Sequence, residues 1–140
     1  MLRFGLAAAA AMLIAGAAQA ADSPSDVVAR HMAAFNKGDL PAMMADYADD
    51  AVVLQSGVAV QGKAAIQNLF ARVAAPPAGG APRLQLTTTK LWQEGDVGFV
   101  TWTAGAIGGT DQFVVRGGKI VVQVVFMGGA PTPPPAPSRP

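Results

Sequence analysis

One stretch, from Phe35 to Ile66, constrains the fold more than any other part of the chain. It reads as the end of a helix, a short helix, a short hairpin and the start of another helix, with almost no residue left over. Gly38 is a natural left-handed helix stop, and Asp39 can cap the next helix. Ser56-Gly57 is typical of a tight turn. Such closely spaced stops and turns indicate a fold far better than they indicate a reaction.

Helices are predicted on both sides of this stretch and within it. Ser23, with Pro24 next and Asp26 three positions on, is typical of a helix start. An apolar stripe at helical spacing follows this start: Val28, His31, Met32 and Phe35. After Gly62 the same spacing recurs at Ile66, Leu69, Phe70 and Val73. The short helix between them is expected to carry Met43, Met44 and Tyr47.

The second half of the chain predicts strands alone. Residues 83–93 alternate between apolar and polar, and a turn at 94–96 leads into a strand over 97–104. Gly117-Gly118 lies between strands at 111–116 and 119–127, which is a strong hairpin signal. Helices first and an antiparallel meander second predict an α+β fold. Three N-terminal helices would pack on one face of a curved, mostly antiparallel sheet.

The two ends of the chain differ from its middle. Arg3, the apolar run from Gly5 to Ala17 and the small residues Ala18-Gln19-Ala20 are typical of a secretory signal peptide. We expect cleavage after Ala20, a periplasmic or secreted location, and no stable membrane insertion afterwards. Residues 130–140 are proline-rich and predict a disordered, polyproline-like tail. One domain is expected between them, over residues 21–129.

The amino-acid composition limits the kinds of partner and cofactor that we expect. Without Arg3 the basic and acidic residues balance, and no basic stripe exists, so nucleic acid is not expected as a partner. The sequence has no cysteine and a single histidine, which argues against a structural metal site. No cofactor-binding motif is present, and we expect none to be bound.

These elements together resemble the nuclear transport factor 2-like (NTF2-like) superfamily, in particular its small bacterial SnoaL-like and DUF4440-like members. The resemblance rests on three short stretches, which are FNKGD at 35–39, YADDAV at 47–52 and GKAAI at 62–66. It implies a cone, in which a strongly curved sheet wraps around the first helix and leaves a pocket at the open end. Because this fold hosts isomerases, dehydratases, hydrolases and binding proteins, it does not define a reaction.

Ketosteroid isomerases share the fold that this resemblance implies. Aligned through the same stretches, their pocket tyrosine falls at His31 and their general base at Gln55. Their neutral pocket acid falls at Asp111 if one residue is dropped in the last hairpin. A primary amide cannot take a proton from carbon, so Gln55 removes the isomerase base. The sequence therefore departs from the isomerase pattern at its decisive residue.

His31 and Asp111 are the candidate catalytic residues. In the register set by Gly117-Gly118, Asp111 faces Val124 on an apolar face, where loss of water should raise its pKa. It would then donate a hydrogen bond to a ligand oxygen, or else reach solvent or cap a backbone amide at the strand end. His31 would carry a proton, or else pack at the edge of the core.

The remaining candidates suit a small apolar or amphipathic ligand. They come from the elements that form the superfamily's pocket, and each could equally be ordinary core: Phe35, Met44, Tyr47, Gln55, Trp92, Trp102 and Phe113. The same hairpin register places a mixed polar and apolar surface on the outer face of the sheet: Gln112, Gln123, Val114, Val121 and Val125. Members of the superfamily often dimerise through this face. We therefore expect a homodimer, and a non-catalytic dimerisation or interaction module is the alternative function.

Overall fold

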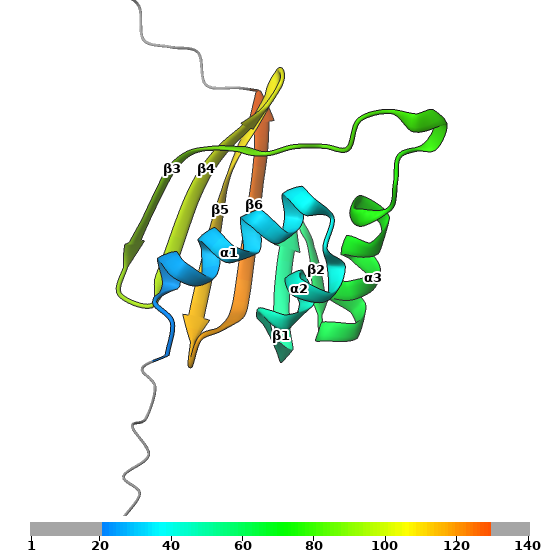
Figure 1. The fold of residues 1–140 in the computed structure, drawn as a ribbon. Helices are drawn as coiled ribbons and strands as arrows, with labels where there is room; N and C mark the ends of the chain where they lie inside the picture. Colours follow the sequence, from blue (N-terminus) through cyan, green and yellow to red (C-terminus); the bar gives the residue numbers. More distant parts are fainter. Residues whose placement is uncertain (1–20, 130–140) are drawn as a thin grey trace, which may run out of the picture.

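The computed structural model describes residues 21–129, so the predicted leader and the proline-rich tail lie outside the described residues. Three helices precede most of the sheet (Figure 1): α1 (Pro24–Lys37), α2 (Leu40–Ala45) and α3 (Lys63–Ala74). A short 3₁₀ turn, η1 (Ala78–Gly80), follows α3. The six strands are β1 (Tyr47–Gln55), β2 (Val58–Gln61), β3 (Thr87–Glu94), β4 (Val97–Ala104), β5 (Ile107–Arg116) and β6 (Lys119–Gly129).

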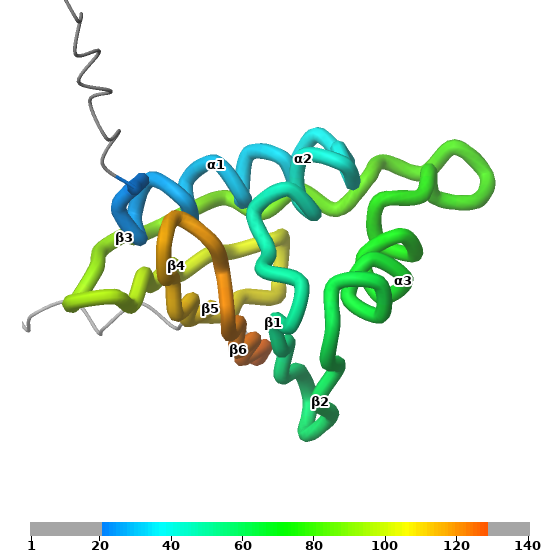
Figure 2. Tube along the Cα trace, turned by 90° about the horizontal axis from the view of Figure 1, so that it is seen from below, coloured from blue at the N-terminus to red at the C-terminus, as the bar shows by residue number. Residues whose placement is uncertain are grey.

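All six strands belong to one sheet in the order β2-β1-β6-β5-β4-β3. Every neighbouring pair is antiparallel except β1 and β6, which run parallel. The sheet curves around α1, while α3 covers its β1–β2 end (Figures 1 and 2). This is the α+β architecture that the sequence predicts. Among residues 21–129, no helix has the length and apolar character needed to cross a bilayer.

Helix α1 begins and ends where its sequence signals predict. Ser23 accepts a hydrogen bond from the Asp26 backbone amide, and Gly38 ends the helix in the left-handed region at φ 67°. Gly98 of β4 lets the helix lie close to the sheet. A Cβ atom at this position would lie 2.7 Å from Val28 Cγ2, too close for a side chain. The buried stripe of α1 thus rests directly on the concave face of the sheet.

Tyr47 was expected on the short helix, but it begins strand β1. Helix α2 ends at Ala45, and the backbone carbonyl of Asp46 accepts a hydrogen bond of 2.8 Å from the Ile120 amide. Tyr47 then pairs with Ile120 of β6. The partner that draws Tyr47 into the sheet lies far along the chain, so no local pattern could reveal it. Similarly, β3 begins at Thr87 rather than at Arg83.

The predicted register of the last hairpin holds only next to its turn. Val115 pairs with Ile120 as expected, but Val114 pairs with Val122, which leaves Val121 as an extra residue in β6. The extra residue shifts every later pair by one residue. Because side chains alternate between the faces of a strand, this shift also exchanges the faces on which the later β6 side chains lie. Phe113 consequently faces Gln123, and Asp111 faces Val125.

The shift also corrects the predicted outer surface. Gln123 was expected on the wetter face together with Gln112, but it is only 3% exposed. Val125 lines the pocket described below instead of the outer face. Two of the five residues assigned to a dimer surface therefore belong to the inside of the molecule.

Candidate functional site

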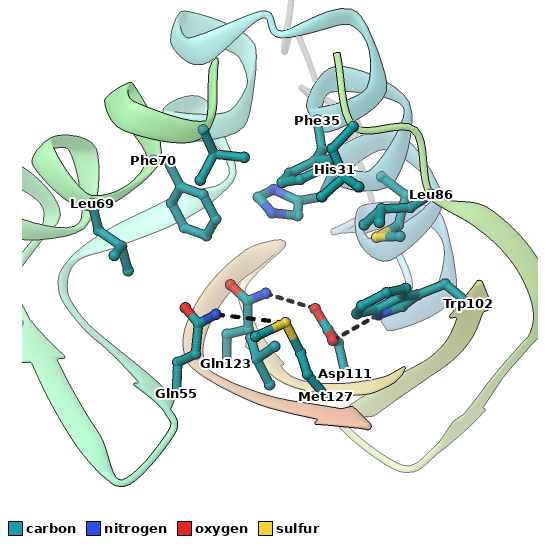
Figure 3. Close-up of a pocket in the computed structure, with 14 residues that line it drawn as sticks. His31, Phe35, Gln55, Leu69, Phe70, Leu86, Trp102, Asp111, Gln123 and Met127 are labelled. Carbon is teal, nitrogen blue, oxygen red and sulfur yellow. Dashed lines mark hydrogen bonds between the residues drawn. The ribbon is translucent and has the colours of Figure 1, made fainter. Parts of the chain in front are cut away.

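A pocket lies between the concave face of the sheet and helices α1 and α3. Its volume is about 110 Å³. A water molecule needs roughly 10–15 Å³ measured in this way, so the pocket has room for several waters or a small organic molecule. In Figure 3, His31 and Phe35 reach in from α1, opposite Asp111 and Gln123 of the sheet. The other residues that line it are Met32, Gln55, Leu69, Phe70, Val73, Leu84, Leu86, Trp102, Val125 and Met127.

Asp111 is the buried acid of this pocket, with 5% of its surface exposed. Trp102 donates its indole N–H to Asp111 Oδ1 over 2.9 Å, and Gln123 Nε2 donates to Oδ2 over 3.0 Å (Figure 3). Burial raises the pKa of Asp111, although both hydrogen bonds oppose this shift. The result is a carboxyl group that takes up a proton more readily than an exposed aspartate.

Tyr47 connects Gln123 to His31 behind the pocket wall. Its hydroxyl donates a hydrogen bond to Gln123 Oε1 and lies 3.4 Å from His31 Nε2. Burial, with smaller contributions from the carboxylates of Asp111 and Asp46, raises the pKa of Tyr47 well above its ordinary value. The hydroxyl of Tyr47 thus keeps its proton and remains available as a donor.

Asp46 lies on the far side of the His31 ring. Its Oδ2 is 3.5 Å from His31 Nδ1, and its Oδ1 accepts a hydrogen bond of 2.8 Å from Arg30 Nε. Burial acts to raise the pKa of Asp46, but the contacts with His31 and Arg30 outweigh it and lower that pKa. Neither Nδ1 nor Oδ2 makes a hydrogen bond to any residue among 21–129. An ionised Asp46 therefore favours a proton on Nδ1 of His31.

The mouth of the pocket is apolar and partly open. Val73 at the end of α3, Leu84 in the following loop and Met127 of β6 are 39%, 44% and 55% exposed. Gln55 reaches the same rim from β1, where its amide lies 3.9 Å from the Met127 sulfur (Figure 3). An entering molecule would meet apolar side chains first and the polar groups of His31 and Asp111 deeper inside.

The structure brings five of the nine predicted site residues together around the pocket: His31, Phe35, Gln55, Trp102 and Asp111. Tyr47 and Phe113 lie directly behind this lining, and both contact the His31 ring edge-on.

Two predicted residues lie elsewhere. Met44 lies beside a separate hollow between α2 and α3, next to Gln67. Trp92 pairs with Phe99, and the two rings stack with their centroids 5.0 Å apart. Side chains alternate along β4, so Phe99 lies on the opposite face from Val100 and Trp102. The Trp92–Phe99 stack thus belongs to the outer face of the sheet.

Sequence reasoning missed Gln123, Asp46 and most of the apolar lining. Gln123 reaches the pocket only because of the irregular register in β6. Asp46 is the turn residue between α2 and Tyr47, and an aspartate is common in turns for local reasons. The predicted helical stripes carried a signal for part of the apolar lining, namely Met32 of α1 and Leu69, Phe70 and Val73 of α3.

The chemistry available in this pocket is acid–base chemistry. An imidazole and a carboxyl group can each bind and release protons, and the amides of Gln55 and Gln123 offer donors and acceptors to a ligand. Within the described part of the chain, no group of three or more His, Cys, Asp or Glu side chains could hold a metal ion.

Comparison with known families agrees with this fold. A family model described as a SnoaL-like domain matches residues 28–125, which include the sheet except for the end of β6, and α1 without its first turn. The chain therefore belongs to the SnoaL-like domain family, and its fold is that of NTF2-like proteins. No curated protein matches the chain in sequence.

Solved structures share the fold at low sequence identity. An NTF2-like protein of unknown function from Cytophaga hutchinsonii has a TM-score of 0.63 and 13% identity, with 79% of this chain and 95% of that chain covered. A putative polyketide cyclase from Sinorhizobium meliloti has a TM-score of 0.60 and 24% identity, with 71% of this chain and 93% of that chain covered. A putative ketosteroid isomerase from Kribbella flavida has a TM-score of 0.61 and 21% identity, with 81% of this chain and 83% of that chain covered. At these identities the likeness concerns the fold alone.

Proposed function

We propose that this chain binds a small, mostly apolar molecule in the pocket, with a polar oxygen of the ligand directed at Asp111. The observation that carries this proposal is the arrangement of the lining. Apolar side chains from α1, α3 and the sheet surround a few convergent polar groups, as is typical of small-molecule sites. A structural core of this size would be filled by side chains rather than left open at Leu84 and Met127.

We further propose that His31 and Asp111 carry out cofactor-free proton transfer on the bound molecule. The raised pKa of Asp111 suits an acid that gives up and regains a proton under mild conditions. Gln55 would orient the ligand but would not remove a proton. The family membership and the description of one structural neighbour as a putative polyketide cyclase are compatible with this chemistry. The leader sequence supports the proposal that the protein acts outside the cytoplasm.

Binding of the neutral fluorescent probe N-phenyl-1-naphthylamine tests the pocket. Phe35→Asn places an amide in the apolar lining and should weaken probe binding at least about tenfold, since it loses more than 1.4 kcal/mol of apolar burial. Phe126→Asn is the matched control, because Phe126 is 55% exposed and does not line this pocket. Equal affinities for both variants would contradict the placement of the site.

Homodimerisation stays a prediction. Of the residues assigned to the dimer surface, Gln112 and Val114 lie on the side of β5 opposite the pocket, where a second copy could contact them. Light scattering on the purified protein reports the oligomeric state. A dimer that neither binds the probe nor carries a copurified small molecule in native mass spectrometry would favour the non-catalytic alternative.

A further inference from the structure

His31 and Asp111 are joined by an unbroken series of polar contacts inside the protein. The series runs from His31 Nε2 to the Tyr47 hydroxyl, from that hydroxyl to Gln123 Oε1, and from Gln123 Nε2 to Asp111 Oδ2. All four residues are buried, with exposed fractions between 1% and 5%. The direction of each hydrogen bond in this buried series therefore depends on its neighbours.

Both ends of the series are fixed. At one end the indole N–H of Trp102 can only donate, so Asp111 Oδ1 must accept. At the other end the Asp46 carboxylate, held by Arg30, lies 3.5 Å from His31 Nδ1 and favours a proton there. Only Asp111 Oδ2, His31 Nε2 and the two groups between them are free to change between donor and acceptor.

Two arrangements satisfy every group between these two ends. In the first, Asp111 is ionised and accepts from Gln123, the Gln123 carbonyl accepts from Tyr47, and Tyr47 accepts from a protonated Nε2 of His31. In the second, Asp111 is protonated and donates to the Gln123 carbonyl, the Gln123 amide donates to Tyr47, and Tyr47 donates to an unprotonated Nε2. A rotated hydroxyl and a flipped amide interconvert the two sets of hydrogen bonds.

We propose that His31 and Asp111 share a single proton, and that Tyr47 and Gln123 couple the two sites by reversing their hydrogen bonds together. The two states contain the same number of protons and differ in the position of one, which is on Nε2 of His31 in the first and on Oδ2 of Asp111 in the second, so the total charge is unchanged. An amide does not conduct protons, so the proton moves through the pocket or through solvent. Tyr47 and Gln123 are thus positioning residues that set the balance between the two states.

The coupling deepens the proposed function, because it would make the two candidate catalytic groups act as one unit with paired protonation states. Other charged or titratable groups near His31 are few. Asp46 faces it from the end of α2, Tyr47 from β1 and Asp111 from β5, while Arg30 acts through Asp46; α3 presents the uncharged ring of Phe70.

The chain contains one histidine, so the ring ¹⁵N chemical shifts of His31 can be assigned without ambiguity. These shifts give the ratio of imidazolium to neutral imidazole at each pH. In Asp111→Asn, the Trp102 N–H keeps the amide oxygen on its own side and turns the new NH₂ group toward Gln123. This substitution therefore imitates protonated Asp111 and should push His31 toward its neutral form.

The decisive comparison is a double-mutant cycle with Tyr47→Phe, which removes the hydroxyl and keeps the ring. With Tyr47 present, Asp111→Asn should lower the imidazolium ratio at least about threefold more than it does in the Tyr47→Phe background, in line with coupling between contacting residues. An equal change in both backgrounds would overturn the proposal, since only attraction through space would then act between the two sites.

Two further variants complete the test. Gln123→Met interrupts the bridge at its other member and should reproduce the effect of Tyr47→Phe, which keeps the test decisive if one variant does not fold. Asp49→Asn removes a carboxylate that is 99% exposed and should leave the ratio unchanged. The measurement uses no ligand, so failure to bind the fluorescent probe would contradict the proposed function without affecting this result. Equal changes in the double-mutant cycle would overturn the coupling and leave the binding proposal standing.

Discussion

Trp102 donates its only polar hydrogen to Asp111, and the two side chains lie on neighbouring strands inside the pocket wall. The indole thus does two things at once, since its ring is part of the apolar lining and its N–H holds the one buried acid of the lining in place. This pairing explains why an aspartate can remain in a mostly apolar pocket. It also leads to a prediction for Asp111 that depends on pH.

Asp111→Asn should become more stabilising, relative to the unchanged protein, as the pH rises. The folded state binds the Asp111 proton more tightly than the unfolded chain, because burial raises the pKa of this carboxyl group. The unchanged protein therefore loses stability from about pH 3.9 upward until the folded pKa is passed, by at most about 1.4 kcal/mol per pH unit. The amide has no such proton to lose.

Urea unfolding of both proteins across this pH range measures the effect. Asp49→Asn serves as the control, because its carboxylate is almost fully exposed and should show no comparable trend. A stability difference between Asp111→Asn and the unchanged protein that stays constant with pH would contradict the prediction.

Asp46→Asn should show the opposite pH trend. The contacts of Asp46 with His31 and Arg30 lower its pKa, so they stabilise the folded state above the unfolded pKa and are lost as the pH falls through the folded pKa. We expect a loss of about 1–3 kcal/mol at neutral pH, the usual cost of leaving a buried hydrogen-bond partner unsatisfied. The stability difference between Asp46→Asn and the unchanged protein should shrink in acid. Urea unfolding of both proteins at neutral and at acidic pH measures it.

Gly109→Ala should disturb the pocket through Trp102. A Cβ atom on Gly109 would lie 2.8 Å from Trp102 Cε2 and 2.5 Å from the backbone oxygen of Phe126, so the indole must shift. Overpacking of this kind typically costs about 1–3 kcal/mol. The affinity for N-phenyl-1-naphthylamine should fall with it.

Gly128→Ala is the matched control for this change. No atom lies within 4 Å of a Cβ built on Gly128, so this variant should keep both its stability and its probe affinity. Thermal unfolding and probe titration of the two variants check the prediction. If Gly109→Ala behaved like Gly128→Ala, the tight contact between β5 and Trp102 would be wrong.

The sequence predicts the parts of this fold that depend on neighbouring residues. The helix stop at Gly38 and the hairpin turn at Gly117-Gly118 follow from local backbone chemistry, and both lie where expected. The class of fold follows from the order of such signals. His31 and Asp111 could be proposed for the pocket because each is a polar residue on an apolar face.

The contacts that complete the site depend on residues far apart in the chain. The extra residue Val121 in β6 has no sequence signature of its own, yet it decides that Gln123 points into the pocket. The pairing of Tyr47 with Ile120 and the contact of Asp46 with His31 likewise appear only after the chain has closed on itself. Sequence reasoning could not supply these relationships because they are properties of the tertiary fold.

The parallel pairing of β1 with β6 has a consequence for the order of assembly. Strand β1 finds its second neighbour only in the last strand, and contacts between such distant segments form slowly because the closing loop is long. Until β6 arrives, the β1–β2 hairpin and the β3–β5 meander share no edge, and Tyr47 has no Gln123 to bind. The polar interior of the pocket is thus complete only when β6, the strand that joins the two halves, has paired with β1.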